Sequence, residues 1–244
     1  MNAFIISNYI GGCLVKRFFK KIIPLSLVLG IFFSSSIGVF ANVSEPVISN
    51  IENIEVVNQL INNIEDEVEV TGEGLYSIDK NAIENEILNM DDNILEILCI
   101  QGGFNSTDEV VNSLIAGIES VNEQIETREI VFIDEENLIS SEDCDYYLQG
   151  GSTYDLTHWW GRTRYKSTYA ANWWAVDLNK QAALNAGTGV IAAAVFGGIG
   201  GIPNGLTSAY CWHLATNVSY YNSLSSRGIV AKITWALAYS MRTQ

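Results

Sequence analysis

The chain has 244 residues, of which 48% are hydrophobic, so it is long enough to bury a sizeable core. Its formal net charge of −15 is divided among three segments, with +4 on residues 1–41, −24 on 42–150 and +5 on 151–244. Because the acidic segment would compete with a nucleic acid for the same cations, a nucleic-acid partner is disfavoured. The change of composition near Gly150 favours an acidic region over 42–150 and a separate basic C-terminal domain over 151–244.

Residues 1–41 have the order of parts found in a secretory signal peptide. A basic stretch ends at Lys21, an apolar stretch covers 22–40, and Val39 and Ala41 are small residues at the positions that a signal peptidase reads. We therefore expect cleavage after Ala41 and a secreted, extracellular protein. The alternative is a retained membrane anchor, because an apolar stretch of about 19 residues can just span a bilayer.

Three cysteines would remain after cleavage, namely Cys99, Cys144 and Cys211. Disulfides persist outside the cytoplasm, and an odd number leaves one thiol free or paired between molecules. A bridge from Cys144 to Cys211 would join the start of the basic domain to its interior, whereas one from Cys99 to Cys144 would stay within the acidic region. The sequence leaves both pairings open.

The acidic region has the apolar periodicity of a mainly helical segment. The predicted elements are helices over 48–64, 82–90 and 110–121 and short strands over 75–78 and 129–133. Asp79 can cap the second helix, and Ser106 with Glu109 forms a capping box ahead of the third. The apolar stripes indicate a region that packs on something and is not a disordered acidic tail.

Aromatic residues interleaved with cations mark the basic domain as the candidate binding region. Rings beside Arg or Lys serve membrane interfaces and carbohydrate platforms alike. The candidate membrane- or ligand-contacting residues are Trp159, Trp160, Arg162, Arg164, Lys166, Trp173 and Trp174. The alternative is structural, with one ring of each tryptophan pair packed inward from a strand.

The basic domain is predicted to be an αα-hairpin bracketed by two antiparallel strands, which makes the chain α+β. The predicted elements are a strand over 157–166, a helix over 169–196, a glycine-rich turn over 197–205, a helix over 206–223 and a strand over 229–242. The last strand alternates strictly, as expected for one long strand with one buried face. In the first strand, His158 is expected on the same side as Arg162 and Arg164.

Residues 181–226 contain no Asp, Glu, Lys or Arg over 46 positions. An uncharged apolar surface of that size would associate in water, so the run must be hidden in a core, a partner or a bilayer. Its glycines keep it below the insertion strength of a leucine-rich span, and burial as a helical hairpin is favoured.

No spacing of reactive side chains supports catalysis. His158 and His213 are the only histidines, and neither has the offset from Cys144 or Cys211 that a zinc site or a nucleophile with its base would need. We therefore expect no catalytic residue, no cofactor and no metal site.

The layout of a signal, an acidic segment and a small cationic domain rich in Gly and Ala resembles secreted bacteriocin or toxin precursors of Gram-positive bacteria. The resemblance implies a membrane-active, antimicrobial C-terminal domain, which an acidic pro-region over 42–150 shields by charge pairing until cleavage. Its partner would be an anionic membrane or the cell envelope. The alternative is a stable secreted module that binds a cell-envelope polymer or a protein and needs no proteolysis.

Overall fold

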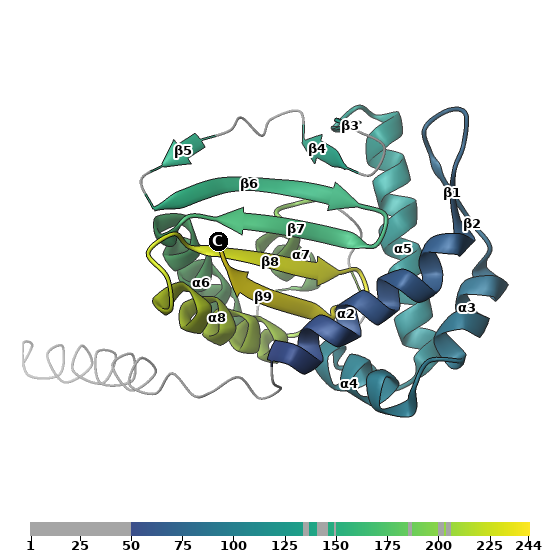
Figure 1. Ribbon diagram of the computed structural model, residues 1–244, viewed down its shortest axis with the longest axis horizontal. Helices are drawn as coiled ribbons and strands as arrows, with labels where there is room; N and C mark the ends of the chain where they lie inside the picture. Colours follow the sequence, from purple (N-terminus) through teal and green to yellow (C-terminus); the bar gives the residue numbers. More distant parts are fainter. Residues whose placement is uncertain are drawn as a thin grey trace, which may run out of the picture. The chain divides into compact units, whose positions relative to one another are not determined.

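The computed structural model describes residues 50–133, 137–140, 146–148, 150–184, 187–199, 203 and 206–244. All of them fall within one compact unit, Ser44–Gln244, in which helices and strands are mixed as predicted for an α+β chain (Figure 1). The predicted signal peptide and Cys144 lie outside the described residues. Secretion, cleavage after Ala41 and the disulfide from Cys144 to Cys211 therefore stay predictions.

The acidic region forms mainly helices, and two of them start at the predicted capping residues. The helices are α2 (Asn50–Ile64), α3 (Lys80–Leu88), α4 (Asp92–Gly102) and α5 (Thr107–Glu126), with a 3-10 helix η1 (Glu65–Glu67) after α2. The Asp79 carboxylate accepts from the N–H groups of Asn81 and Ala82 at the start of α3. At the start of α5, Ser106 accepts from the N–H of Glu109, and the Glu109 carboxylate accepts from the N–H of Asn105.

Two antiparallel sheets run through the described residues. The small one pairs β1 (Val68–Val70) with β2 (Tyr76–Ile78). The large one has the order β3-β4-β6-β7-β8-β9, with β5 paired to β6. Its strands are β3 (Ile130–Phe132), β4 (Leu138–Ser140), β5 (Tyr146–Leu148), β6 (Gly151–His158), β7 (Gly161–Lys166), β8 (Ile229–Thr234) and β9 (Tyr239–Thr243). The large sheet thus contains strands from both sides of Gly150.

The C-terminal segment is a hairpin of β8 and β9, where one long strand is predicted. The N–H of Thr234 donates to the carbonyl of Ala238 at 2.8 Å and closes the turn, in which Leu237 has a φ of 60°. The apolar alternation continues through this turn because Trp235 and Leu237 are both wholly buried there. Periodicity alone therefore does not reveal the reversal.

A tight turn at Trp159 and Trp160 divides the other predicted strand into β6 and β7. His158 pairs with Gly161 across this turn. Gly161 has a φ of 155°, and a Cβ there would overlap the carbonyl oxygen of Ile233 on the neighbouring strand β8. Glycine is required because β7 and β8 approach each other so closely at this point.

The reversal changes which side chains share a face of the sheet. His158 lies on the face of Thr163, whose hydroxyl is 3.0 Å from its Nε2, whereas Arg162 and Arg164 lie on the opposite face. The predicted grouping of His158 with these two arginines is therefore wrong. We call the face with His158 and Thr163 the outer face.

Three helices cover the face opposite the outer face. They are α6 (Thr168–Ala183), α7 (Thr188–Phe196) and α8 (Ser208–Ser223) (Figure 1). The helix predicted over 169–196 is thus two helices, since Gly187 adopts an extended conformation and begins α7. α6 and α8 are antiparallel, and Asn222 near the end of α8 donates to the carbonyl of Thr168 at the start of α6.

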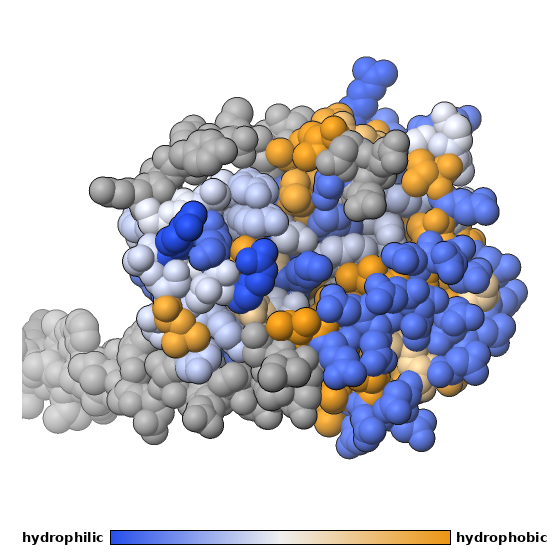
Figure 2. Space-filling view, in the orientation of Figure 1, coloured by the Kyte–Doolittle hydropathy of each residue, from blue (hydrophilic) through white to orange (hydrophobic). Residues whose placement is uncertain are grey.

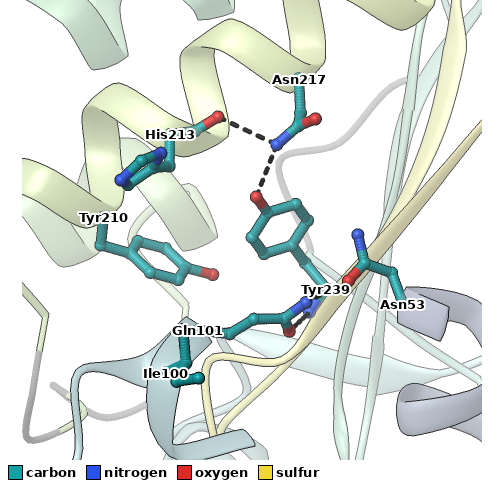
Figure 3. A pocket seen from close by; sticks show the side chains of 7 residues that line it. All are labelled: Asn53, Ile100, Gln101, Tyr210, His213, Asn217 and Tyr239. Carbon is teal, nitrogen blue, oxygen red and sulfur yellow. Dashed lines mark hydrogen bonds between the residues drawn. The ribbon is translucent and has the colours of Figure 1, made fainter. Parts of the chain in front are cut away.

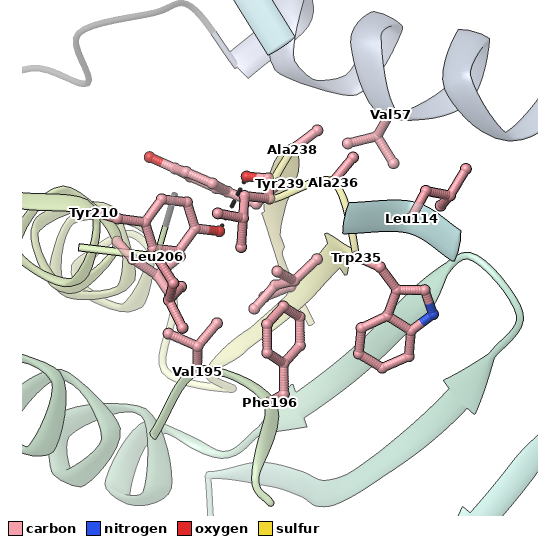
Figure 4. Close-up of a cluster of buried hydrophobic side chains, with 14 of the residues drawn as sticks. Val57, Leu114, Val195, Phe196, Leu206, Tyr210, Trp235, Ala236, Ala238 and Tyr239 are labelled. Atoms are coloured by element: carbon pink, nitrogen blue, oxygen red, sulfur yellow. Dashed lines mark hydrogen bonds between the residues drawn. The ribbon is translucent and has the colours of Figure 1, made fainter. Parts of the chain in front are cut away.

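Trp235 joins the acidic region to the C-terminal strands in one hydrophobic core (Figure 4). Its carbonyl accepts from the hydroxyl of Ser113 on α5 at 2.8 Å, and its ring centroid lies 5.0 Å from that of Phe196 on α7. The indole N–H donates to the carbonyl of Trp159 at 2.7 Å. Gly117 of α5 leaves the space that the indole ring occupies.

Candidate functional site

A groove between α2 and the outer face of the sheet combines apolar, polar and cationic side chains. Its volume is about 150 Å³. It is lined by Ile54 and Asn58 of α2, Val230 and Lys232 of β8, and Ser240, Met241 and Arg242 of β9. We call these residues the α2 groove.

The α2 groove contains two cations that have no acidic partner among the residues that the structure describes. The ammonium of Lys232 lies 5.8 Å from the centroid of the Trp160 ring, and Arg242 is exposed and donates to the carbonyl of Thr243. None of the lining residues is acidic. The two cations beside the Ser240 hydroxyl can bind a carboxylate or a phosphate, and the apolar lining can hold the chain that carries it.

The setting of the groove is otherwise acidic. Hydrophilic side chains gather over α2, α3 and α4 (Figure 2), and the segment 42–150 that contains these helices has a net charge of −24. The cations of the groove therefore lie beside α2, which belongs to this acidic segment. A negatively charged ligand would be drawn to the groove over a short range only, because screening limits the attraction to about 8–10 Å at ordinary salt.

Stacked rings stiffen the outer face beside the groove. Tyr154 of β6 stacks on Tyr165 of β7 with ring centroids 4.2 Å apart, and His158 stacks on Trp160 at 4.5 Å. Tyr154 and Tyr165 are a directly opposed pair of the two strands, whereas His158 and Trp160 stack at the turn that joins β6 and β7. The Trp160 ring lies beneath the ammonium of Lys232.

The three cations predicted as contact residues on β7 lie on the helix-covered face and bind one carboxylate. Asp155 of β6 is 3.1 Å from Arg164 Nη2, 2.8 Å from Lys166 Nζ and 3.8 Å from Arg162 Nη2. Arg162 also donates to the carbonyl of Phe196, and Arg164 donates to that of Ala194 at 3.0 Å. These carbonyls end α7, whose partial negative charge favours cations at this position.

Burial and charge shift the pKa values of this ion cluster in opposite ways. Burial alone would raise the pKa of Asp155, but Arg164, Lys166 and Arg162 together hold it well below its usual range. Burial, followed by repulsion from Arg164, lowers the pKa of Lys166 to about 8 despite the attraction of Asp155. The Lys166 ammonium is therefore less favourable in the folded protein than in the unfolded chain.

This depressed pKa predicts a pH-dependent contribution to stability. Between about pH 8 and pH 10, the unfolded chain keeps the Lys166 proton that the folded protein has lost, so the contribution of this residue to stability should rise with pH. Urea unfolding across this range gives the free energy of unfolding of the wild type and of Lys166→Gln. We expect the value for the wild type to rise with pH relative to that of the variant. Titrating thiols and tyrosines contribute equally to both proteins, and a difference that is constant with pH would contradict the assignment.

The four predicted tryptophans lie in different surroundings. Trp160 is buried on the outer face, Trp159 is half-buried at the turn, and Trp174 is buried beneath Arg164, whose guanidinium carbon lies 4.6 Å from its ring centroid. The Trp174 indole N–H donates to the carbonyl of Ala194 at 2.9 Å. Trp173 is exposed on α6. The predicted residues therefore do not form one continuous surface.

A second, smaller cavity of about 70 Å³ lies where the acidic region meets α8 and β9 (Figure 3). Gln101 of α4 links the two, since its amide donates to Asn53 of α2 and its carbonyl oxygen accepts from the N–H of Tyr239. The Tyr239 hydroxyl accepts from Asn217 of α8 at 2.6 Å, and burial raises its pKa to about 12. These bonds tie helices α2 and α4 to the C-terminal hairpin.

The described cysteines are poorly placed for thiol chemistry. Cys211 is wholly buried in α8, and burial, with a smaller effect of Asp177, raises its pKa to about 12. Burial and Glu109 also raise the pKa of Cys99. Within the described ranges, no group of three or more His, Cys, Asp or Glu side chains could hold a metal ion.

Sequence reasoning missed the two cations that line the α2 groove. Lys232 and Arg242 come together through the register of the hairpin, which sets Lys232 opposite Ser240 and Val230 opposite Arg242. A strand predicted to run straight through the turn cannot bring them together. The sequence did contain an indication of the site, because Lys232 and Arg242 both belong to the more polar set of alternating residues in 229–242.

No protein-family model, no curated protein and no solved structure matches this chain. The site must therefore be interpreted from its own geometry, which is that of a small cationic groove beside a rigid sheet.

Proposed function

We propose that the protein is a secreted, non-enzymatic binding module that holds an anionic polymer of the cell envelope in the α2 groove. The observation that carries the proposal is the presence of Lys232 and Arg242, without an acidic partner among the described residues, in one groove of a chain with net charge −15. Carboxylate or phosphate groups of such a polymer would pair with these cations. Ile54, which is 37% exposed, would contact its apolar parts.

The shared core supports a stable module over a precursor that loses residues 42–150. Strands β3 and β4 belong to the same sheet as β6, and Ser113 of α5 donates to the carbonyl of Trp235. Removing the acidic region would uncover Trp235 and the neighbouring Ala236, which are wholly buried. If the membrane-active precursor is correct instead, N-terminal analysis of the secreted protein should find a species beginning near Ser152 and none beginning at Asn42.

The groove is tested by removing its two charges. Lys232→Gln with Arg242→Gln should weaken binding to soluble polyglutamate about tenfold, since two partly exposed ion pairs are worth up to roughly 2 kcal/mol together. The matched control is Lys180→Gln with Arg227→Gln, which removes the same charge from exposed positions outside the groove. Isothermal titration at two salt concentrations gives the affinities.

The control separates a site from general electrostatics. We expect it to bind like the wild type, and we expect higher salt to weaken binding of both. Equal losses in both double variants would show that the polymer responds only to net charge. Unchanged binding in the groove variant would exclude the groove as the site.

A further inference from the structure

α6 presents an apolar ridge along its exposed side. Tyr169, Trp173 and Val176 are 62%, 59% and 52% exposed, and their spacing of four and three residues places them on one side of the helix. Lys180 and Leu184 continue this spacing to the end of α6, and Leu184 is 65% exposed. The Tyr169 and Trp173 rings contact each other edge to face, with centroids 6.2 Å apart. We call these five residues the α6 ridge.

The surroundings of the α6 ridge carry almost no charge. α7 and α8 fall within the uncharged run 181–226, and they expose further apolar side chains, Val190 on α7 and Trp212 on α8. Asp177, the acid of α6, is half-buried and accepts from the side-chain amide of Gln181 at 3.0 Å. Lys180 is therefore the exposed charge of α6.

We infer that the α6 ridge binds the surface of a membrane that carries anionic headgroups, with α6 lying in the plane of the interface. Tyr and Trp have an apolar body and a polar tip, which suits them to the boundary between headgroups and acyl chains. Lys180 would meet a headgroup phosphate. The ridge extends over roughly 22 Å of helix, at 1.5 Å per residue, which is long enough to anchor a helix on the surface.

Charge complementarity favours a membrane over a second copy of the chain. A symmetric contact between two ridges would cover the rings, but the ridge contains no acid that could pair with Lys180 of the other copy. An anionic membrane offers both an apolar layer and negative charge. Among the helices that the structure describes, none is both long and apolar enough to cross a bilayer.

Binding to vesicles tests whether the α6 ridge contacts a membrane. The substituted residues are exposed, so that their replacement leaves the core intact. The chain beginning at Asn42 is used, because Ser44–Gln244 is a compact unit and the apolar segment 22–40 would bind lipid by itself. Tyr169→Ser with Trp173→Ser should lower the partition coefficient on phosphatidylglycerol and phosphatidylcholine vesicles about tenfold or more. Lys180→Gln should lower it about fivefold on these vesicles and leave binding to pure phosphatidylcholine unchanged.

The matched control is Val70→Ser with Leu88→Ser, which removes two side chains of similar exposure from the acidic region. We expect this control to sediment with vesicles as the wild type does. Equal sedimentation of the ridge variant and the wild type would overturn the inference. A second result would also overturn it, namely a wild type that fails to bind vesicles but forms a dimer in light scattering that the ridge substitutions dissociate. The ridge would then be a contact between two copies of the chain.

Discussion

Gly117→Ala should destabilise the protein by about 2 kcal/mol or more, although alanine is the better helix former. Gly117 lies in α5, where replacing glycine by alanine normally gains up to about 1 kcal/mol. A Cβ at this position would overlap Cγ and Cβ of Trp235, which is wholly buried and held by hydrogen bonds at its carbonyl and its indole N–H. Overpacking costs of about 1–3 kcal/mol are typical when neighbours cannot move.

Urea unfolding followed by circular dichroism gives the free energy of unfolding for this test. Gly72→Ala is the matched control, because nothing lies within 4 Å of a Cβ built there. We expect the control to change stability by less than about 0.5 kcal/mol. A stabilised Gly117→Ala protein would mean that α5 and the C-terminal hairpin do not pack together.

Asp155→Asn should cost about 3–5 kcal/mol, the range found when one partner of a buried ion cluster is removed. The substitution keeps the shape of the side chain but leaves Arg162, Arg164 and Lys166 on the helix-covered face without their counterion. Because the pKa of Asp155 is far below its usual range, its stabilising effect should be complete above about pH 4, where the carboxylate is ionised in the unfolded chain as well. It should be lost progressively as the pH falls from about 4 toward the depressed pKa of the folded protein.

Asp177→Asn provides the comparison for the loss of a carboxylate, since this side chain is half-buried and accepts from Gln181 only one helical turn away. Its cost should be below about 1 kcal/mol. Adding Lys166→Gln to Asp155→Asn should recover part of the lost stability, because one uncompensated cation is removed. Thermal unfolding of the wild type, the two single variants and the double variant ranks their stabilities. Equal losses of stability in Asp155→Asn and Asp177→Asn would contradict the role of the buried ion cluster.

Helices α2, α3 and α5 of the acidic region were predictable because each follows from contacts close in sequence. Asp79 and Ser106 accept the first backbone N–H groups of α3 and α5, and such caps can be recognised from neighbouring residues alone. α4 was not predicted, since apolar residues lie on several of its sides. Ile94 and Leu98 are buried, whereas Ile100 is 60% exposed, so no single stripe marks the helix.

The candidate site was not predictable, because it depends on two reversals of the chain. In one straight strand, Lys232 and Arg242 would lie roughly 33 Å apart at 3.3 Å per residue, whereas the hairpin places them on adjacent strands. The turn at Trp159 and Trp160 likewise sets Asp155 opposite Arg164, which explains why the cations of β7 are neutralised inside the protein. Composition identified the basic and aromatic residues but not the sides of the sheet on which they lie.

The absence of charge from 181–226 also affects how the protein withstands proteases. Enzymes that cut after Lys or Arg, and those that cut after Glu or Asp, have no site between Gln181 and Ser226, so α7 and α8 contain no bond that they recognise. Secreted proteases of these specificities would have to open the fold elsewhere first. In a tryptic digest, both helices would be released together as one long apolar peptide ending at Arg227.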